Sequence, residues 1–169
     1  MKAYLFLTTW GVHLTCLSQL LIFISSIIEH NSSRFWGERY LWRFTWVLFE
    51  ILVPMNILIT LVFWVFLYPD LIGRDFKTTQ KVEFFTSHSL PLIVTQIDFW
   101  VNGWMFKYSH LVIVIGFAIV YMIVNLIATF ALGTPLYPII TWKDWGTAIF
   151  VPCLMILIIC LFLAFTWIS

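Results

Sequence analysis

The chain has 169 residues, of which 62% are hydrophobic, 20% are aromatic and only 10% are charged. Soluble domains average about 45–50% apolar and about 25% charged residues, so this composition excludes a water-soluble globular protein and predicts an integral membrane protein. The net charge of +1 leaves no basic patch. We therefore expect membrane lipids as the surroundings of this chain and no nucleic acid as a partner.

Apolar runs of the length that a bilayer requires, about 20 residues, occur five times. In chain order they cover about 4–28, 44–68, 82–101, 111–132 and 148–167. The first run is too long and too polar for a secretory signal, so we interpret it as a span. Short connections leave no room for a soluble domain. We expect an all-α, polytopic transmembrane bundle of five spans that forms a single domain over residues 1–169.

The orientation of this bundle does not follow from its charges. In a five-span chain the nine basic residues divide five against four between the two sides, so the positive-inside rule favours neither. The sequon at Asn31 would place the first loop outside the cytosol if it were glycosylated, although a chance tripeptide in a polar loop is the commoner explanation.

Three cysteines occur in the chain, namely Cys16, Cys153 and Cys160. Each lies in an apolar stretch and none belongs to a CxxC pair, so the sequence predicts neither a disulfide framework nor a zinc site. We expect the three thiols to act as small hydrophobic groups in the core.

Polar residues recur at helical spacing in two of the predicted spans. In the first span they are Thr8, Gly11, Thr15, Ser18 and Gln19, and in the third span they are His88, Pro91, Thr95 and Asp98. A polar side chain in hydrocarbon is costly, so such residues normally face the interior of a bundle. The spacing therefore predicts two polar stripes that face each other. For Thr15, Ser18 and Thr95 we favour a simpler role, a hydrogen bond to the carbonyl four residues earlier or close helix packing.

Pro91 removes a backbone hydrogen bond from the third span, which predicts a kink and a freed carbonyl near His88 that needs a partner. Asp98 lies ten residues beyond His88, or about 15 Å along a helix, and cannot orient that imidazole directly. Glu50 is either a buried, hydrogen-bonded carboxyl or a group that reaches the interface, and the sequence names no partner for it.

The histidines do not form a metal or haem motif. His13 lies away from the polar stripe of the first span and is expected to be structural, and His110 is expected at a wet interface. The sequence contains no HxxxH or HExxH, and no carboxylate lies within one helical turn of His13, His88 or His110. We expect no metal, haem or other cofactor.

Four segments occur in an order that is typical of one family. They are YLFLTTWG at 4–11, FWVFLYPDLI at 63–72, HSLPLIVTQID at 88–98 and GTPLYPIITW at 133–142. This order resembles the androgen-induced protein family and its rolling-stone-like branch, which are multi-pass membrane proteins. The shared features are a Tyr-Leu-Thr start, an aromatic helix end before an acidic turn, a histidine followed ten residues later by an acidic residue, and a Tyr-Pro loop.

The resemblance implies an intramembrane hydrolase that cleaves lipid esters, with fatty acid esters of hydroxy fatty acids as the substrate class. By position, Thr8 would be the nucleophile and His88 its base, with Thr9, Asp98 and Pro91 as possible support. A threonine hydroxyl needs an adjacent base to become a useful nucleophile, and imidazole suits that task near neutral pH. Family members usually carry one more span before the threonine helix. The androgen-induced branch also has a second histidine where this chain has Phe85.

The competing hypothesis is a non-catalytic accessory subunit that packs against other subunits of a larger membrane complex. Its 17 phenylalanines and ten tryptophans would suit contacts with partner helices. Family resemblance implies the endoplasmic reticulum or the plasma membrane, whereas an accessory subunit would fit an organellar inner membrane such as that of mitochondria. A small transporter would need paired intramembrane charges or an inverted repeat, which the sequence lacks.

Overall fold

A computed structural model describes residues 2–30, 38–71 and 75–169. This part of the chain contains six α-helices and no β-strand, which confirms the predicted all-α class. The helices are α1 (Leu7–His30), α2 (Glu38–Val62), α3 (Thr78–His88), α4 (Leu90–Asn102), α5 (Leu111–Leu132) and α6 (Trp145–Ile168). The sequon at Asn31 lies outside the described residues.

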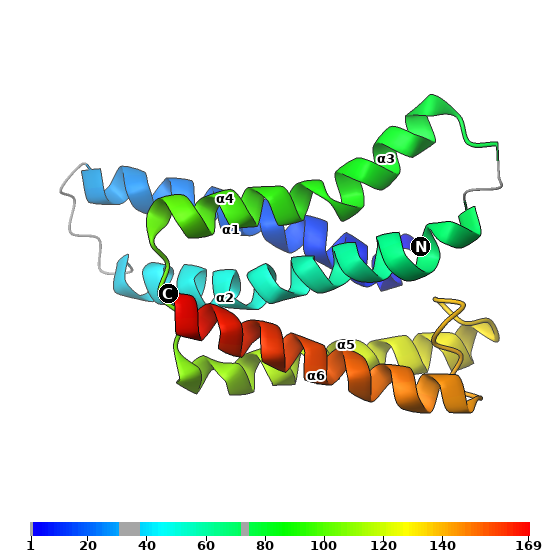
Figure 1. The fold of residues 1–169 in the computed structure, drawn as a ribbon. Helices are drawn as coiled ribbons and strands as arrows, with labels where there is room; N and C mark the ends of the chain where they lie inside the picture. Colours follow the sequence, from blue (N-terminus) through cyan, green and yellow to red (C-terminus); the bar gives the residue numbers. More distant parts are fainter. Residues whose placement is uncertain (1, 31–37, 72–74) are drawn as a thin grey trace.

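Helix α2 lies at the centre of the bundle. Helices α1 and α4 pack beside it, and α5 and α6 pack against it as a second group (Figure 1). In the most apolar part of α2, 67% of the residues are buried, against 22% in α1, α5 and α6. The two chain ends lie towards opposite ends of the bundle (Figure 1).

Four helical segments are long and apolar enough to cross a membrane, and they identify an integral membrane protein. They are Leu7–Ile28, Arg39–Leu67, Tyr108–Leu132 and Trp145–Ile168. The predicted span 111–132 coincides with α5, whereas the second and last helices begin several residues before the predicted starts at 44 and 148. Both helices start earlier than predicted because the polar and charged residues before their apolar runs are also helical.

The predicted span 82–101 is not one continuous helix. It divides into α3 and α4 at Ser89, because Pro91 in the first turn of α4 cannot donate to a carbonyl of α3. The hydroxyl of Thr60 donates to the His88 carbonyl at 2.5 Å, and Trp64 Nε1 donates to Ser89 Oγ at 2.8 Å. The predicted kink is therefore confirmed, and Thr60 of α2 binds the His88 carbonyl beside the break.

The two predicted polar stripes meet at the interface of α1 with α4. Gln19 Nε2 donates directly to the Asp98 carboxylate. Nearer the middle, Asn56 of α2 lies between them and donates to Thr15 Oγ1 at 3.0 Å and to the Pro91 carbonyl at 3.4 Å. A single buried amide thus connects α1, α2 and α4.

For three small polar residues we expected a hydrogen bond to the carbonyl four residues earlier or close helix packing, and the structure differs from one residue to the next. Thr95 Oγ1 donates to the Pro91 carbonyl four residues earlier at 2.9 Å, as predicted. Thr15 differs, because it accepts a hydrogen bond from Asn56 of another helix. Ser18 is fully buried, and its hydroxyl has no partner among the described residues, which agrees only with a packing role.

The prediction that the cysteines lie in the core is wrong. Cys16, Cys153 and Cys160 are all free and exposed on the outer surface of their helices. In a membrane protein the lipid-facing side of a helix is as apolar as its interior side, so an apolar neighbourhood does not indicate which side a residue occupies.

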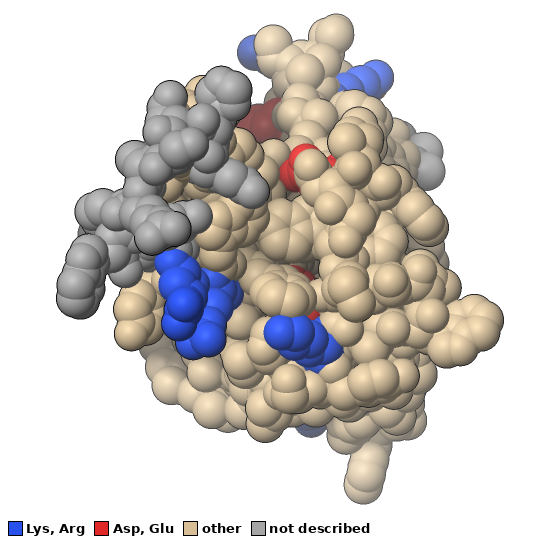
Figure 2. Space-filling model, turned by 90° about the vertical axis from the view of Figure 1, so that its left-hand side faces the viewer, with Lys and Arg blue, Asp and Glu red and all other residues tan. Residues whose placement is uncertain are grey.

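The structure shows which groups bind Glu50, for which the sequence indicated no partner. Glu50 is fully buried in α2, where Oε1 accepts the Lys107 backbone N–H at 2.8 Å and Oε2 contacts His110 Nδ1. The Lys107 ammonium lies 3.9 Å from the ring centroid of Trp46. Figure 2, which looks onto this end of the bundle, shows a few basic side chains on a mostly uncharged surface. His110 is 22% exposed and lies at this end of the bundle.

Candidate functional site

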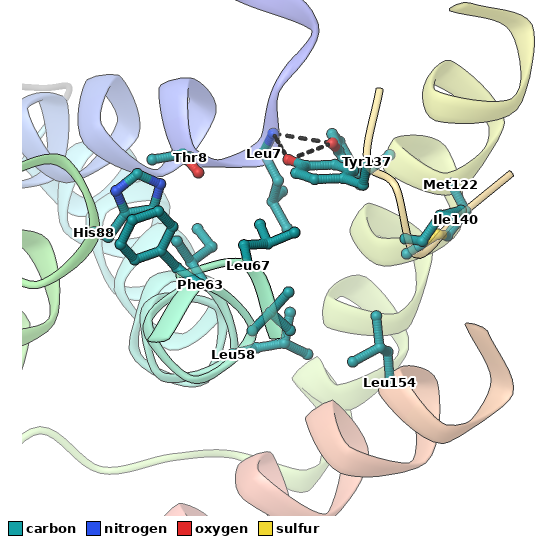
Figure 3. Close-up of a pocket in the computed structure, with 13 residues that line it drawn as sticks. Leu7, Thr8, Leu58, Phe63, Leu67, His88, Met122, Tyr137, Ile140 and Leu154 are labelled. Carbon is teal, nitrogen blue, oxygen red and sulfur yellow. Dashed lines mark hydrogen bonds between the residues drawn. The ribbon is translucent and has the colours of Figure 1, made fainter. Parts of the chain in front are cut away.

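A narrow cavity of about 40 Å³ lies at the opposite end of the bundle from Glu50, where α1, α2, α3, α5 and α6 approach the loop before α6 (Figure 3). Aliphatic side chains, Phe63 and Met122 form most of its wall. The polar residues of the wall are Thr8, His88, Tyr121 and Tyr137. Two of these four are the predicted nucleophile and the predicted base.

Thr8 lies in the first turn of α1, where backbone N–H groups have no partner within the helix. The N–H of Leu7 is satisfied from outside, because it donates to Tyr121 Oη at 2.9 Å and to Tyr137 Oη at 3.0 Å. These bonds attach the start of α1 to α5 and to the following loop. They hold Thr8 at the cavity wall.

His88 is the last residue of α3, and its ring is held in place on two sides. Its Nδ1 lies 2.9 Å from the Phe84 carbonyl and 2.9 Å from Ser87 Oγ, and the ring stacks on Phe63 with centroids 3.5 Å apart. A carbonyl can only accept, so Nδ1 carries the proton in the neutral imidazole and Nε2 keeps a free lone pair. This is the tautomer that a general base requires.

Thr8 and His88 lie next to each other at the cavity wall although 80 positions separate them in the sequence (Figure 3). Among the hydrogen bonds of the described residues, none joins the two side chains directly. A cavity needs only about 10–15 Å³ to hold a water, so this one has room for a water beside them.

Tyr137 brings a third hydroxyl to the site. Its Oη accepts from Leu7 N–H, lies 3.2 Å from the Tyr121 hydroxyl and is within hydrogen-bonding reach of Thr8. The single hydroxyl proton of Tyr121 has two acceptors within reach, Tyr137 Oη at 3.2 Å and the Leu5 carbonyl at 3.3 Å. When Tyr121 donates to Tyr137, both acceptor positions of Tyr137 are filled and its own proton is available to Thr8 and the cavity. Burial raises the pKa of Tyr137 well above its ordinary value, so it stays a proton donor at neutral pH.

Thr9 lies outside this cavity. It lines a separate groove with Tyr4 and His13, and its carbonyl contacts His13 Nδ1 at 2.7 Å. The local bond agrees with a structural role for His13. Of the two neighbouring threonines, only Thr8 lies beside His88.

Asp98 and Pro91 also lie away from the cavity. Asp98 is bound to Gln19 near the far end of α4, and the Pro91 carbonyl is bound by Asn56. Pro91 affects the site only through the helix break that ends α3 at His88. The structure thus brings together two of the five predicted site residues. In the described ranges, no three His, Cys, Asp or Glu side chains form a group suited to a metal ion.

The sequence does not single out Tyr121 and Tyr137 as site residues. The only signal was the Tyr-Pro turn at 137–138, which we assigned to family resemblance and not to chemistry. Tyr121 lies in the middle of a strongly apolar run, where a tyrosine is hard to distinguish from a packing aromatic.

No family model, curated protein or solved structure matches this chain. The fold and its apolar helices define an integral membrane protein, and any narrower function depends on the geometry of the cavity.

Proposed function

We propose that this protein is an intramembrane hydrolase of lipid esters, related to the androgen-induced and rolling-stone-like proteins, with Thr8 as nucleophile and His88 as base. One observation carries the proposal. The threonine hydroxyl and an imidazole with a free Nε2 line the same cavity, and the helices that bring them there are far apart in the sequence.

The chemistry would proceed in two steps. His88 Nε2 takes the proton of Thr8 Oγ1 while that oxygen attacks the ester carbonyl, and the imidazolium then protonates the departing alcohol. In the second step His88 takes a proton from water, the hydroxide cleaves the acyl-threonine ester, and the proton returns to Thr8. Fatty acid and alcohol leave, and both side chains regain their initial states.

Tyr137 would stabilise the negative charge that develops on the carbonyl oxygen. Its proton turns towards Thr8 when Leu7 N–H and the Tyr121 hydroxyl both donate to its oxygen. A donor that is already oriented in an apolar site costs no reorganisation when charge appears. Tyr121 and Leu7 thus position Tyr137 and take no part in the bond-making and bond-breaking steps.

Substrate binding has to widen the site, because about 40 Å³ does not hold an ester group. The break at Ser89 separates α3 from α4 and allows α3, which carries His88, to move as a unit. Catalytic hydrogen bonds are often loose without substrate and tighten when it binds. We expect the Thr8 hydroxyl and His88 Nε2 to reach hydrogen-bonding distance in that state.

We further propose that the chain crosses the membrane five times, with α3 and α4 together forming the broken third crossing. Their 25 residues from Thr78 to Asn102 extend about 37 Å if helical throughout, enough to cross the hydrocarbon core. Apolar side chains on their outer surface, among them Ile93, Ile97 and Trp100, support contact with lipid. A lipid hydrolase of this kind fits the endoplasmic reticulum or the plasma membrane.

The test is ester hydrolysis by the purified full chain in phospholipid vesicles, with a fatty acid ester of a hydroxy fatty acid as substrate. Thr8→Ala and His88→Ala should each lower turnover by at least about a thousandfold. Thr9→Ala and His13→Ala are the matched controls on α1 and should keep wild-type turnover. A fluorophosphonate probe should label the wild type and the controls but not Thr8→Ala.

Unchanged turnover in His88→Ala would remove this residue from the mechanism, and labelling that persists in Thr8→Ala would point to another nucleophile. If the wild type hydrolyses no ester and is recovered only with other membrane chains, the accessory-subunit hypothesis replaces the hydrolase.

A further inference from the structure

A second cavity of about 30 Å³ adjoins the Thr8 and His88 cavity. The two share five residues of their walls, namely Leu7, Leu58, Tyr121, Met122 and Leu154. The second cavity continues one helical turn further from the site, to Met55 on α2, Phe117 on α5 and Ile158 on α6. Because each of these steps leads towards the middle of the bundle, the two cavities lie one after the other along it, and we refer to them together as the channel.

The wall of the deeper cavity is almost entirely hydrocarbon. Its one polar side-chain group is the Tyr121 hydroxyl, which is already bonded to Leu7 N–H. Any hydroxyl or charge on a molecule in this cavity would be buried without a partner, which is costly. The channel therefore suits a plain alkyl chain.

Methionines are concentrated along this channel. Met55, Met122 and Met155 line it, and the whole chain has five methionines. Methionine has an unbranched, flexible side chain that adapts to ligands of varying shape. These side chains can move aside for a thin chain, although the channel is narrower than an alkyl chain in the present structure.

We propose that this channel binds the acyl chain of the substrate ester and that Met55, Phe117 and Ile158 at its inner end limit the length of that chain. The preferred substrate would be an ester whose acyl part is straight and unsubstituted, with the alcohol part directed towards lipid. This inference rests on the proposed function. If Thr8 attacks the ester carbonyl, the acyl chain attached to that carbonyl extends into the channel.

The experiment compares four forms of the full chain in detergent micelles with 4-methylumbelliferyl esters from butanoyl to hexadecanoyl. Ala118→Leu adds bulk to the channel wall on α5, and Met155→Ala removes it from α6. Ala131→Leu is the matched control, because it adds the same bulk to an exposed position of α5. Binding of a fluorescent fatty acid, cis-parinaric acid, is measured on the same samples.

In Ala118→Leu we expect the best substrate to become shorter and turnover of the wild-type optimum to fall by about tenfold, while butanoyl ester turnover is retained. In Met155→Ala the optimum should move to longer chains, and Ala131→Leu should match the wild type. Parinaric acid should bind to the wild type and the control but weakly to Ala118→Leu.

An identical chain-length profile in all active forms would overturn the channel and leave the hydrolase intact. If no form hydrolyses any ester, the proposed function fails, and parinaric acid binding then decides alone whether the channel holds alkyl chains. If Ala118→Leu does not fold, the chain-length profile of Met155→Ala is the test. A Met155→Ala profile identical to that of the wild type counts against the channel.

Discussion

The carboxylate of Glu50, fully buried in α2, contacts Nδ1 of His110 just before α5 begins. Its second oxygen accepts the backbone N–H of Lys107 at 2.8 Å. These contacts attach the connection between α4 and α5 to the central helix. Both halves of the bundle are thus joined at the end that lies farthest from the cavity lined by Thr8 and His88.

Removing this imidazole should destabilise the fold without affecting the cavity directly. His110→Ala leaves Glu50 with one donor for a buried carboxylate, and hydrogen bonds to charged groups contribute about 2 kcal/mol. We expect a loss of that size in unfolding by SDS titration, whereas His13→Ala at an exposed position should change little. Equal stability of the two variants would show that His110 does not stabilise Glu50.

Tyr137→Phe tests the hydroxyl that we assign to the developing oxyanion. Loss of one such donor costs about a hundredfold or more in turnover, and we expect kcat to fall by that amount with little change in KM. Tyr108→Phe, at an exposed position, serves as the control. A change in KM alone would mean that Tyr137 shapes the binding site and takes no part in the chemistry.

Gly11 allows α1 to lie close to α2. A Cβ at this position would lie 2.7 Å from Ile59 Cδ1 and 3.2 Å from Asn56 Oδ1, whereas a Cβ at Gly116 would meet no atom within 4 Å. Overpacking costs about 1–3 kcal/mol, so Gly11→Val should lower the free energy of unfolding by that amount more than Gly116→Val does. Similar stability of the two valine variants would contradict a tight α1–α2 contact.

The loop that carries Tyr137 should loosen in acid. Asp144 caps α6 by accepting the Thr147 N–H at 2.7 Å, and the Thr141 hydroxyl donates to it at 2.5 Å. The Thr141 and Thr147 hydrogen bonds lower the pKa of Asp144 below its ordinary value. A lowered carboxyl pKa contributes stability above the unfolded pKa of about 3.9, and this is lost as the pH falls through the folded value.

Hydrogen exchange at the Thr147 amide measures this effect. Protection, corrected for intrinsic exchange, should be lower at about pH 3 than at about pH 6 in the wild type. In Asp144→Ala it should be low at both values. Equal protection of the wild type at both pH values would show that the carboxylate does not hold this turn.

The sequence predicted the parts of the fold that depend on hydrophobic length and helical spacing. The all-α class and the apolar helices follow from hydrophobic length, and the facing of two polar stripes follows from residues that share one helix face. The break near Pro91 follows from its missing N–H. Each of these features depends on local chemistry or on one regular periodicity.

Contacts between distant segments were not predictable in this way. Glu50 and His110 are 60 positions apart, and Leu7 meets Tyr137 across 130 positions, so no periodicity connects them. The proximity of Thr8 to His88 came from family resemblance and not from spacing. Its position in a shared cavity depends on how α1 and α3 pack against α2, which is a tertiary property.

The three cysteines, whose outward position contradicts their predicted burial, offer natural reporters of depth in the bilayer. Cys153 and Cys160 lie two turns apart on α6, about 10 Å along its axis. Spin labels attached there would sense oxygen and paramagnetic ions at two levels of the hydrocarbon, and no engineered thiol would be needed. Once Cys16 on α1 is replaced by serine, the two remaining thiols can therefore report the tilt of the last helix.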